Sequence, residues 1–135
     1  SDSTVIRTKL QTPELIRHDE EKEPYTEFPQ GVKLVKYDSK MNVISSITAL
    51  YAKNYTNDDR WEAKNNVVAV NQNGDTLKTE YLVWDSKKGR IYSDQFVRIL
   101  RKDMDLTGTG FSANQDFSDY NFKNPSGPMY IEIDK

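Results

Sequence analysis

One pattern of residues recurs in this chain at a spacing of thirty. Segment 47–70 aligns without a gap on segment 77–100, and a third copy begins at Thr107. The matched pairs are Tyr51 with Tyr81, Arg60 with Arg90, Trp61 with Ile91 and Val67 with Val97, and Phe111 follows Tyr81 at the same spacing. Periods of roughly 20 to 50 residues are typical of proteins built from stacked structural repeats.

Each copy has the pattern of a β-hairpin. The five prolines all lie outside residues 30–124, so nothing in this span blocks a β-ladder. Asn-Gly in segment 71–75 and the glycine of segment 85–90 separate runs rich in Val, Ile, Thr and Tyr, which is a hairpin signal. We expect strands near 4–11, 32–37, 43–53, 61–70, 76–84, 90–100, 106–114, 119–123 and 128–133, a bulge near Gln95 and Phe96, and no helix.

Stacking of the copies follows from the weakness of a single hairpin. Two strands are marginally stable in water, whereas stacked hairpins bring equivalent residues into columns and form one continuous interior. The sequence therefore predicts an all-β, two-walled trough. Its first and last strands would expose unpaired N–H and C=O groups, which a partner of the same architecture can extend by strand addition.

The columns predict which side chains face the interior. The residues expected there are Ile47, Ala49, Tyr51, Trp61, Ala63, Val67, Leu77, Thr79, Tyr81, Ile91, Ser93, Val97, Ile99 and Phe111, with Ala69 and Thr109 in the same columns. Large and small residues share this list, so two interpretations stay open. The interior is either an ordinary core of large side chains packed against small ones, or an apolar groove wide enough for acyl chains.

Other classes of function have little support in the sequence. The 19 basic and 21 acidic residues give a net charge of −2, which does not indicate a surface for nucleic acid or an anionic membrane. Cysteine is absent and His18 is the single histidine, in the charged segment 18–23, so we expect no catalytic residues and no enzyme activity. Segment 103–108 resembles the start of a calcium loop, but Asn114 stands where a glutamate is needed, so we expect a turn, no metal and no cofactor.

Several segments together resemble a known family. They are FPQGVKLVKYD, the run from ITALYAKNY to IYSDQFVRI, and LTGTGFSANQDF, and they contain W-x-A-x-x-N-V (61–67), G-D-T-L-K-T-E-x-L-x-W (74–84), I-Y-S-D (91–94) and G-x-G-F-x-A (108–113). Their order and spacing are similar to those of the periplasmic lipopolysaccharide-export component C family (LptC-like) and, more broadly, of the OstA-like superfamily of LptA.

The resemblance implies a fold and a function. Residues 1–135 would form a single folded-over antiparallel β-jelly roll, also called a β-taco, with open edges and no catalysis. Family members receive lipopolysaccharide from an inner-membrane ABC extractor and pass it to a periplasmic bridge protein of the same fold, with the acyl chains inside the trough. The N-terminal edge is expected to join the extractor and the C-terminal edge the bridge. We expect a periplasmic domain, attached to the inner membrane through a segment missing from this chain.

A second function stays open at this point. A carbohydrate-binding β-jelly roll would display aromatic side chains on an outer concave face, and Trp61, Tyr81 and Trp84 are the candidates for that role. Lipid A that binds while free saccharides do not would decide between the two functions.

Overall fold

The computed structural model describes residues 7–126, which form one antiparallel sheet of eleven strands. The strands are β1 (Arg7–Gln11), β2 (Ile16–His18), β3 (Tyr25–Phe28), β4 (Val32–Tyr37), β5 (Val43–Ala49), β6 (Tyr51–Tyr55), β7 (Arg60–Val70), β8 (Thr76–Asp85), β9 (Arg90–Arg101), β10 (Met104–Asn114) and β11 (Asn121–Ser126). Within this described part of the chain there is no helix, and therefore none that is long and apolar enough to cross a membrane. The all-β, folded-over jelly-roll prediction is confirmed.

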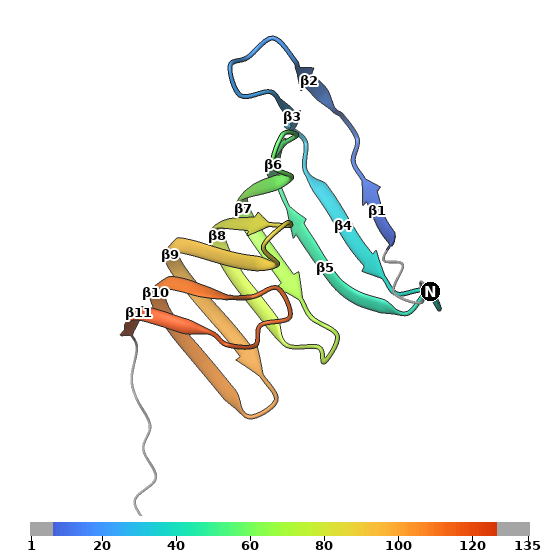
Figure 1. The fold of residues 1–135 in the computed structure, drawn as a ribbon. Helices are drawn as coiled ribbons and strands as arrows, with labels where there is room; N and C mark the ends of the chain where they lie inside the picture. The colour runs from blue at the N-terminus through green and yellow to red at the C-terminus, as the bar shows by residue number, and fades with distance from the viewer. Residues whose placement is uncertain (1–6, 127–135) are drawn as a thin grey trace, which may run out of the picture.

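The sheet folds over on itself into two walls (Figure 1). Wall 1 contains β1, β4, β5 and the halves of the long strands that pair with them; wall 2 contains β2, β3, β6 and the other halves. Strand β7 shows the division most clearly, because Val68–Val70 pair with β5 whereas Arg60–Lys64 pair with β6. Strands β8, β9 and β10 continue the same path, so each long strand contributes to both walls.

The crease between the walls falls where the backbone leaves regular β geometry. Asn65 and Asn66 have positive φ in the middle of β7, and Gly110 has φ 70° in the middle of β10. The ladders shift register at the same level, between Lys64 and Val67 and between Thr109 and Phe111. Asparagine and glycine tolerate left-handed backbone better than other residues, so these positions let a continuous strand turn from one wall into the other.

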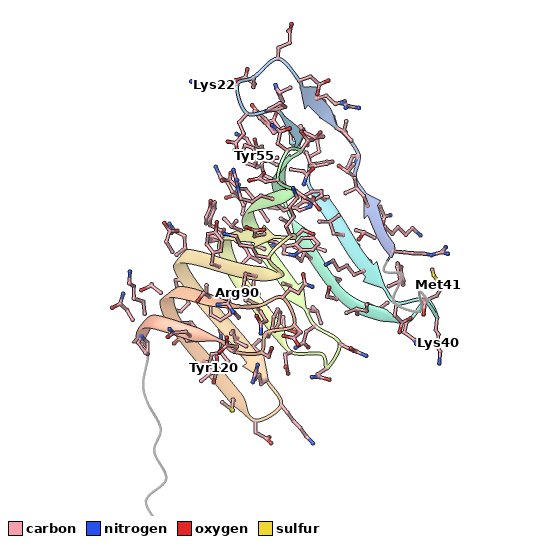
Figure 2. The ribbon with its side chains drawn as sticks, in the orientation of Figure 1. Lys22, Lys40, Met41, Tyr55, Arg90 and Tyr120 are labelled. Carbon is pink, nitrogen blue, oxygen red and sulfur yellow. The ribbon has the colours of Figure 1, made fainter. Side chains whose placement is uncertain are left out.

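The two walls enclose one hydrophobic core. Its buried members come from both walls, for example Leu34 and Leu77 from wall 1 and Phe28 and Leu82 from wall 2. The charged tips lie at the far ends of the walls: Figure 2 shows Lys40 at the end of the β4–β5 hairpin and Lys22 on the loop between β2 and β3. The low hydrophobic content of this chain, 36%, thus suits a thin interior with two solvent-exposed outer faces.

The predicted strands are confirmed in their main features. The segment 32–37 has the predicted bounds, the hairpin turns at 71–75 and 85–90 are present, and the predicted bulge in β9 coincides with the register shift opposite Gly110. The segment predicted as 43–53 is two strands, β5 and β6, because the chain crosses the crease at Leu50. The short strands β2 and β3 were not predicted, and the expected strand 128–133 lies outside the described residues.

Candidate functional site

Wall 2 presents a row of aromatic rings to the interior. The rings of Phe28 and Trp61 stack with centroids 5.5 Å apart, and those of Trp61 and Trp84 stack at 6.5 Å. The small residues Ala52 and Ala63 lie beside them and are buried, which leaves the rings room to lie against the sheet. The row runs across the strands, from the N-terminal end of the sheet toward its middle.

Wall 1 faces this row with aliphatic side chains. One column passes through Ile47, Ala69, Leu77, Ile99 and Leu106, which lie opposite one another in successive ladders. Of these residues, Leu77 and Ile99 are fully buried. This column of wall 1 is therefore apolar at every strand from β5 to β10.

Twelve of the fourteen residues predicted to face the interior do so. They are Ile47, Ala49, Trp61, Ala63, Val67, Leu77, Thr79, Ile91, Ser93, Val97, Ile99 and Phe111; Ile47 and Trp61 are half-buried and the other ten are buried. The two polar members have internal partners: the Thr79 hydroxyl donates to the Phe96 carbonyl oxygen at 2.7 Å, and the Ser93 hydroxyl accepts from the Gln95 amide at 3.1 Å.

The placement of Tyr51 and Tyr81 in the interior was wrong. Both lie opposite Lys64 in their ladders, whereas their neighbours Ala52 and Leu82 lie opposite Ala63 and are buried. Cross-strand partners share a face of the sheet, so the two tyrosines are on the outer face of wall 2.

For Tyr81 the reason is one extra residue at the crease of β8, which reverses the in–out alternation of this strand. Counting every second residue from Leu77 and Thr79 leads to Tyr81, but the inward side chains beyond the crease are Leu82 and Trp84. The same reversal occurs in β10, where Gly108 and Phe111 are buried, so Thr109 was also misplaced.

The outer face of wall 2 is held together by hydrogen bonds to carboxylates. The Tyr51 hydroxyl donates to Glu27 Oε2 at 2.6 Å, and the Tyr81 hydroxyl donates to Glu62 Oε2 at 3.2 Å. Burial and the neighbouring carboxylate raise the pKa of both phenols, that of Tyr81 to about 12. In turn, the hydrogen bonds from Tyr51 and His18 lower the pKa of Glu27.

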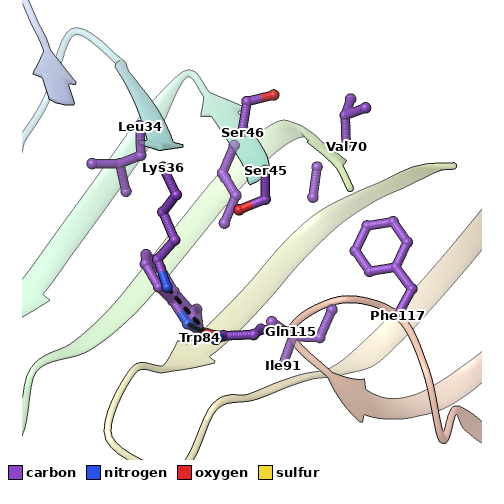
Figure 3. A pocket seen from close by; sticks show the side chains of 11 residues that line it. Leu34, Lys36, Ser45, Ser46, Val70, Trp84, Ile91, Gln115 and Phe117 are labelled. Carbon is purple, nitrogen blue, oxygen red and sulfur yellow. Dashed lines mark hydrogen bonds between the residues drawn. The ribbon is translucent and has the colours of Figure 1, made fainter. Parts of the chain in front are cut away.

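A cationic residue of wall 1 reaches across the interior to wall 2. The ammonium group of Lys36, on β4, lies 4.1 Å from the centroid of the Trp84 ring and donates to Gln115 Oε1 at 3.2 Å (Figure 3). The Trp84 indole N–H donates to the same oxygen at 3.0 Å. Burial lowers the pKa of Lys36. We call Lys36, Trp84 and Gln115 the clasp.

The interior beside the clasp is almost full. Leu34, Ile47, Ile91 and Phe117 line a cavity of about 20 Å³ there, which is room for about one water molecule. A bulky apolar ligand therefore does not fit until side chains move or the walls separate.

Some interior residues were missed by the sequence patterns. They are Phe28, Leu34, Ala52, Leu82, Trp84, Ala113 and Phe117. Ala52 and Leu82 are thirty residues apart, so they form a column of the repeat. This column was missed because the neighbouring column, Tyr51 and Tyr81, was taken as the inward one. Phe117 lies in a loop with positive φ, where no periodicity applies.

The aromatic residues considered for sugar binding do not share a face. Trp61 and Trp84 point into the interior, whereas Tyr81 is on the outer face. Among residues 7–126 there is no cluster of three or more possible metal ligands. His18, at the end of β2, is 3.0 Å from Glu27 and stacks on Tyr25, so it belongs to the outer face of wall 2 and not to a loop.

Both ends of the sheet carry lightly covered strands. All five residues of β1 are exposed, and β1 pairs with β4 alone in the described part of the chain. At the other end β11 pairs with β10 and is exposed at five of its six residues. Among residues 7–126, β1 and β11 are thus the edge strands at the two ends of the main strand order.

Comparison with known proteins assigns the chain to a family. A search of curated proteins found no match. The chain does match the family described as "Lipopolysaccharide-assembly, LptC-related" over residues 6–124, which is most of its length and includes every element from β1 to β10. The chain therefore belongs to the LptC-related family of lipopolysaccharide-assembly proteins.

Proposed function

We propose that the interior between the two walls carries the acyl chains of lipopolysaccharide. The observation that supports this most is the apolar column of wall 1 from Ile47 to Leu106, which faces the aromatic row of Phe28, Trp61 and Trp84 on wall 2. The sugars of the ligand would stay outside, where the walls carry charged side chains.

Hydrophobic burial gives the groove its role. Each acyl methylene removed from water contributes about 0.8 kcal/mol, so chains exposed during transfer would lose tens of kcal/mol. A continuous apolar lining avoids that exposure. Because the unloaded interior has a cavity of only about 20 Å³ beside the clasp, loading requires the walls or their side chains to move apart.

The direction of transfer is set by which partner donates lipopolysaccharide and which accepts it. We propose that the protein receives lipopolysaccharide from an inner-membrane ABC extractor and passes it to a periplasmic bridge protein of the same fold, with no catalytic step. Pairing of strand edges would align one trough with the next. We place the domain in the periplasm, attached to the inner membrane.

The binding step has a direct test that separates it from sugar recognition. Purified protein is titrated with lipopolysaccharide and, separately, with the oligosaccharide left after complete deacylation. Binding of the intact molecule with no binding of the oligosaccharide supports the groove. Equal binding of both would instead support a carbohydrate-binding module.

The coupling step is tested by deleting β1. All five residues of this strand are exposed, so removing residues 1–11 should leave the core intact. The expected result is loss of co-purification with the extractor and unchanged binding to the bridge protein. Normal co-purification with both partners would contradict the assignment of the N-terminal edge to the extractor.

A further inference from the structure

The segment between β10 and β11, residues 115–120, begins and ends on wall 2 and reaches across to wall 1 in between. It leaves wall 2 at Asn114 and is held there by the Gln115 amide, which donates to the Gly89 carbonyl oxygen at 2.9 Å. On the wall 1 side, the Asn71 side-chain amide donates to the Asp116 carbonyl oxygen at 3.0 Å, and Arg101 donates to the Phe117 carbonyl oxygen at 2.9 Å. We call this segment the strap.

The strap inserts one apolar side chain into the interior. Phe117 is 2 % exposed and lines the same cavity as Leu34 and Ile91 (Figure 3). Its backbone has φ 73°, a left-handed conformation in which a bulky residue is strained. The conformation persists because burial of the ring and the hydrogen bonds to both walls offset the strain.

The strap also provides the hydrogen-bond acceptor for the ammonium group of the clasp. Lys36 donates to Gln115 Oε1, and no carboxylate of the described residues lies within ion-pair distance of Lys36. Gln115 thus supplies an uncharged oxygen to a half-buried ammonium group, a position in which an anionic oxygen would bind more strongly.

These two contacts together resemble those of an anionic amphiphile. We propose that the strap is a built-in occupant of the groove, which the ligand displaces: Phe117 takes the place of an acyl chain, and Gln115 takes the place of an anionic headgroup oxygen on Lys36. The ligand class for this end of the groove is accordingly an alkyl chain next to a phosphate or carboxylate. This inference rests on the proposed acyl-chain function and adds to it a closed, unloaded state.

The strap is suited to displacement because it lies outside the ladders and its outer side is open. Asp116, Ser118, Asp119 and Tyr120 are exposed, and the strap contributes no residue to any ladder. Release of the strap breaks the polar contacts described above, the ion pair of Arg90 with Asp119 and the contact of Arg101 with the Tyr120 ring, and water can replace the polar partners. The ladders of β10 and β11 stay paired when this happens.

The test compares Phe117→Ala with Val83→Ala. Val83 is also buried, but it lies opposite Glu62 and Tyr92 on the outer face of wall 2, so its truncation leaves the groove unchanged. Binding of dodecyl phosphate is measured for both variants, with their melting temperatures. We expect both variants to lose stability. Only Phe117→Ala should bind dodecyl phosphate more tightly, by about fivefold or more. The reason is that the apparent affinity of the wild type is reduced by the fraction of molecules in which the strap has left the groove.

Two further measurements test the proposal even if Phe117→Ala does not fold. Gln115→Ala releases the clasp without removing an apolar group and should also tighten binding. In the wild-type protein, dodecyl phosphate should speed hydrogen exchange at the Gln115 and Phe117 amides, which are bonded in the unloaded state. Unchanged or weaker binding by Phe117→Ala, or slower exchange in the strap, would overturn the proposal. Wild-type protein that binds no alkyl ligand at all would instead overturn the acyl-chain function itself.

The role of Lys36 is tested with a matched cation. Lys36→Met is compared with Lys53→Met, because Lys53 also lies over a ring, that of Tyr25 at 4.5 Å, on the outer face. The preference for dodecyl phosphate over dodecanol should fall in Lys36→Met alone, and inorganic phosphate should bind neither protein measurably. An unchanged preference in Lys36→Met, or tight binding of phosphate by itself, would contradict the assignment of Lys36 to a headgroup.

Discussion

Leu82 lies opposite Ala63 in the β7–β8 ladder, whereas the adjacent Tyr81 lies opposite Lys64, so two consecutive side chains face opposite sides of wall 2. Leu82 is 1 % exposed and belongs to the core between the walls. The Tyr81 hydroxyl instead bonds to Glu62 on the outer face. This pair defines the inside and the outside of the trough at the level just beyond the crease.

The first prediction concerns stability at this pair. Leu82→Ala should lower the free energy of unfolding by about 2–5 kcal/mol, because it removes buried methyl groups and leaves a cavity. Tyr81→Phe keeps the ring and loses one hydrogen bond to Glu62, so it should cost only about 1 kcal/mol. Urea unfolding of the two variants measures both values, and a larger loss for Tyr81→Phe would contradict the orientations.

The repeat predicted much of the interior because its spacing is uniform between the first two copies. The ladders relate Ile47 to Leu77 through Ala69, a spacing of 77 − 47 = 30. They relate Leu77 to Leu106 through Ile99, which is 106 − 77 = 29. The third copy is thus one residue out of step with the gapless alignment.

The crease could not be read from alternation alone. In β7 the inward residues Ala63 and Val67 keep one parity, because two residues, Asn65 and Asn66, form the irregular part. In β8 the parity reverses between Thr79 and Leu82. A pattern of period two carries no information on such a reversal, and this is why Tyr51 and Tyr81 were misplaced whereas Val67 and Val97 were not.

The second prediction concerns the close approach of β10 and β11. A Cβ atom on Gly108 would lie 2.6 Å from Phe122 Cδ1 and 2.8 Å from the Asn124 carbonyl oxygen, so Gly108→Ala should push β11 away. We expect a loss of about 1–3 kcal/mol and faster hydrogen exchange throughout β11.

The control for this substitution is Gly74→Ala. Gly74 has φ 84° and nothing within 4 Å of an added Cβ, so its substitution strains the β7–β8 turn without touching β11. Its β11 amides should exchange at the wild-type rate. Equal exchange of β11 in the two variants would show that Gly108 is not required for the contact.

The third prediction concerns acid stability. Hydrogen bonds from Tyr51 and His18 lower the pKa of Glu27 in the folded protein. A carboxylate with a lowered folded-state pKa stabilises the fold above its unfolded pKa of about 4.3, and this contribution is lost as the pH falls through the folded-state value. Glu27→Gln should therefore be less stable than wild type at pH 7 and should lose less stability on acidification.

Urea midpoints at a series of pH values from neutral to acid measure this difference. Glu14→Gln, an equal change of charge at an exposed position, serves as the control and should follow the wild-type curve. A Glu27→Gln curve parallel to wild type across the whole range would show that the carboxylate of Glu27 is not linked to folding.

The most direct test of the transport account is a photo-crosslinking amino acid placed at position 81 or at position 82 in cells that export lipopolysaccharide. The two positions are adjacent in the chain, and their side chains lie on opposite faces of the same strand. The account predicts lipopolysaccharide adducts from position 82 and none from position 81. Adducts from position 81 with none from position 82 would place the cargo on the outer face and would contradict the groove.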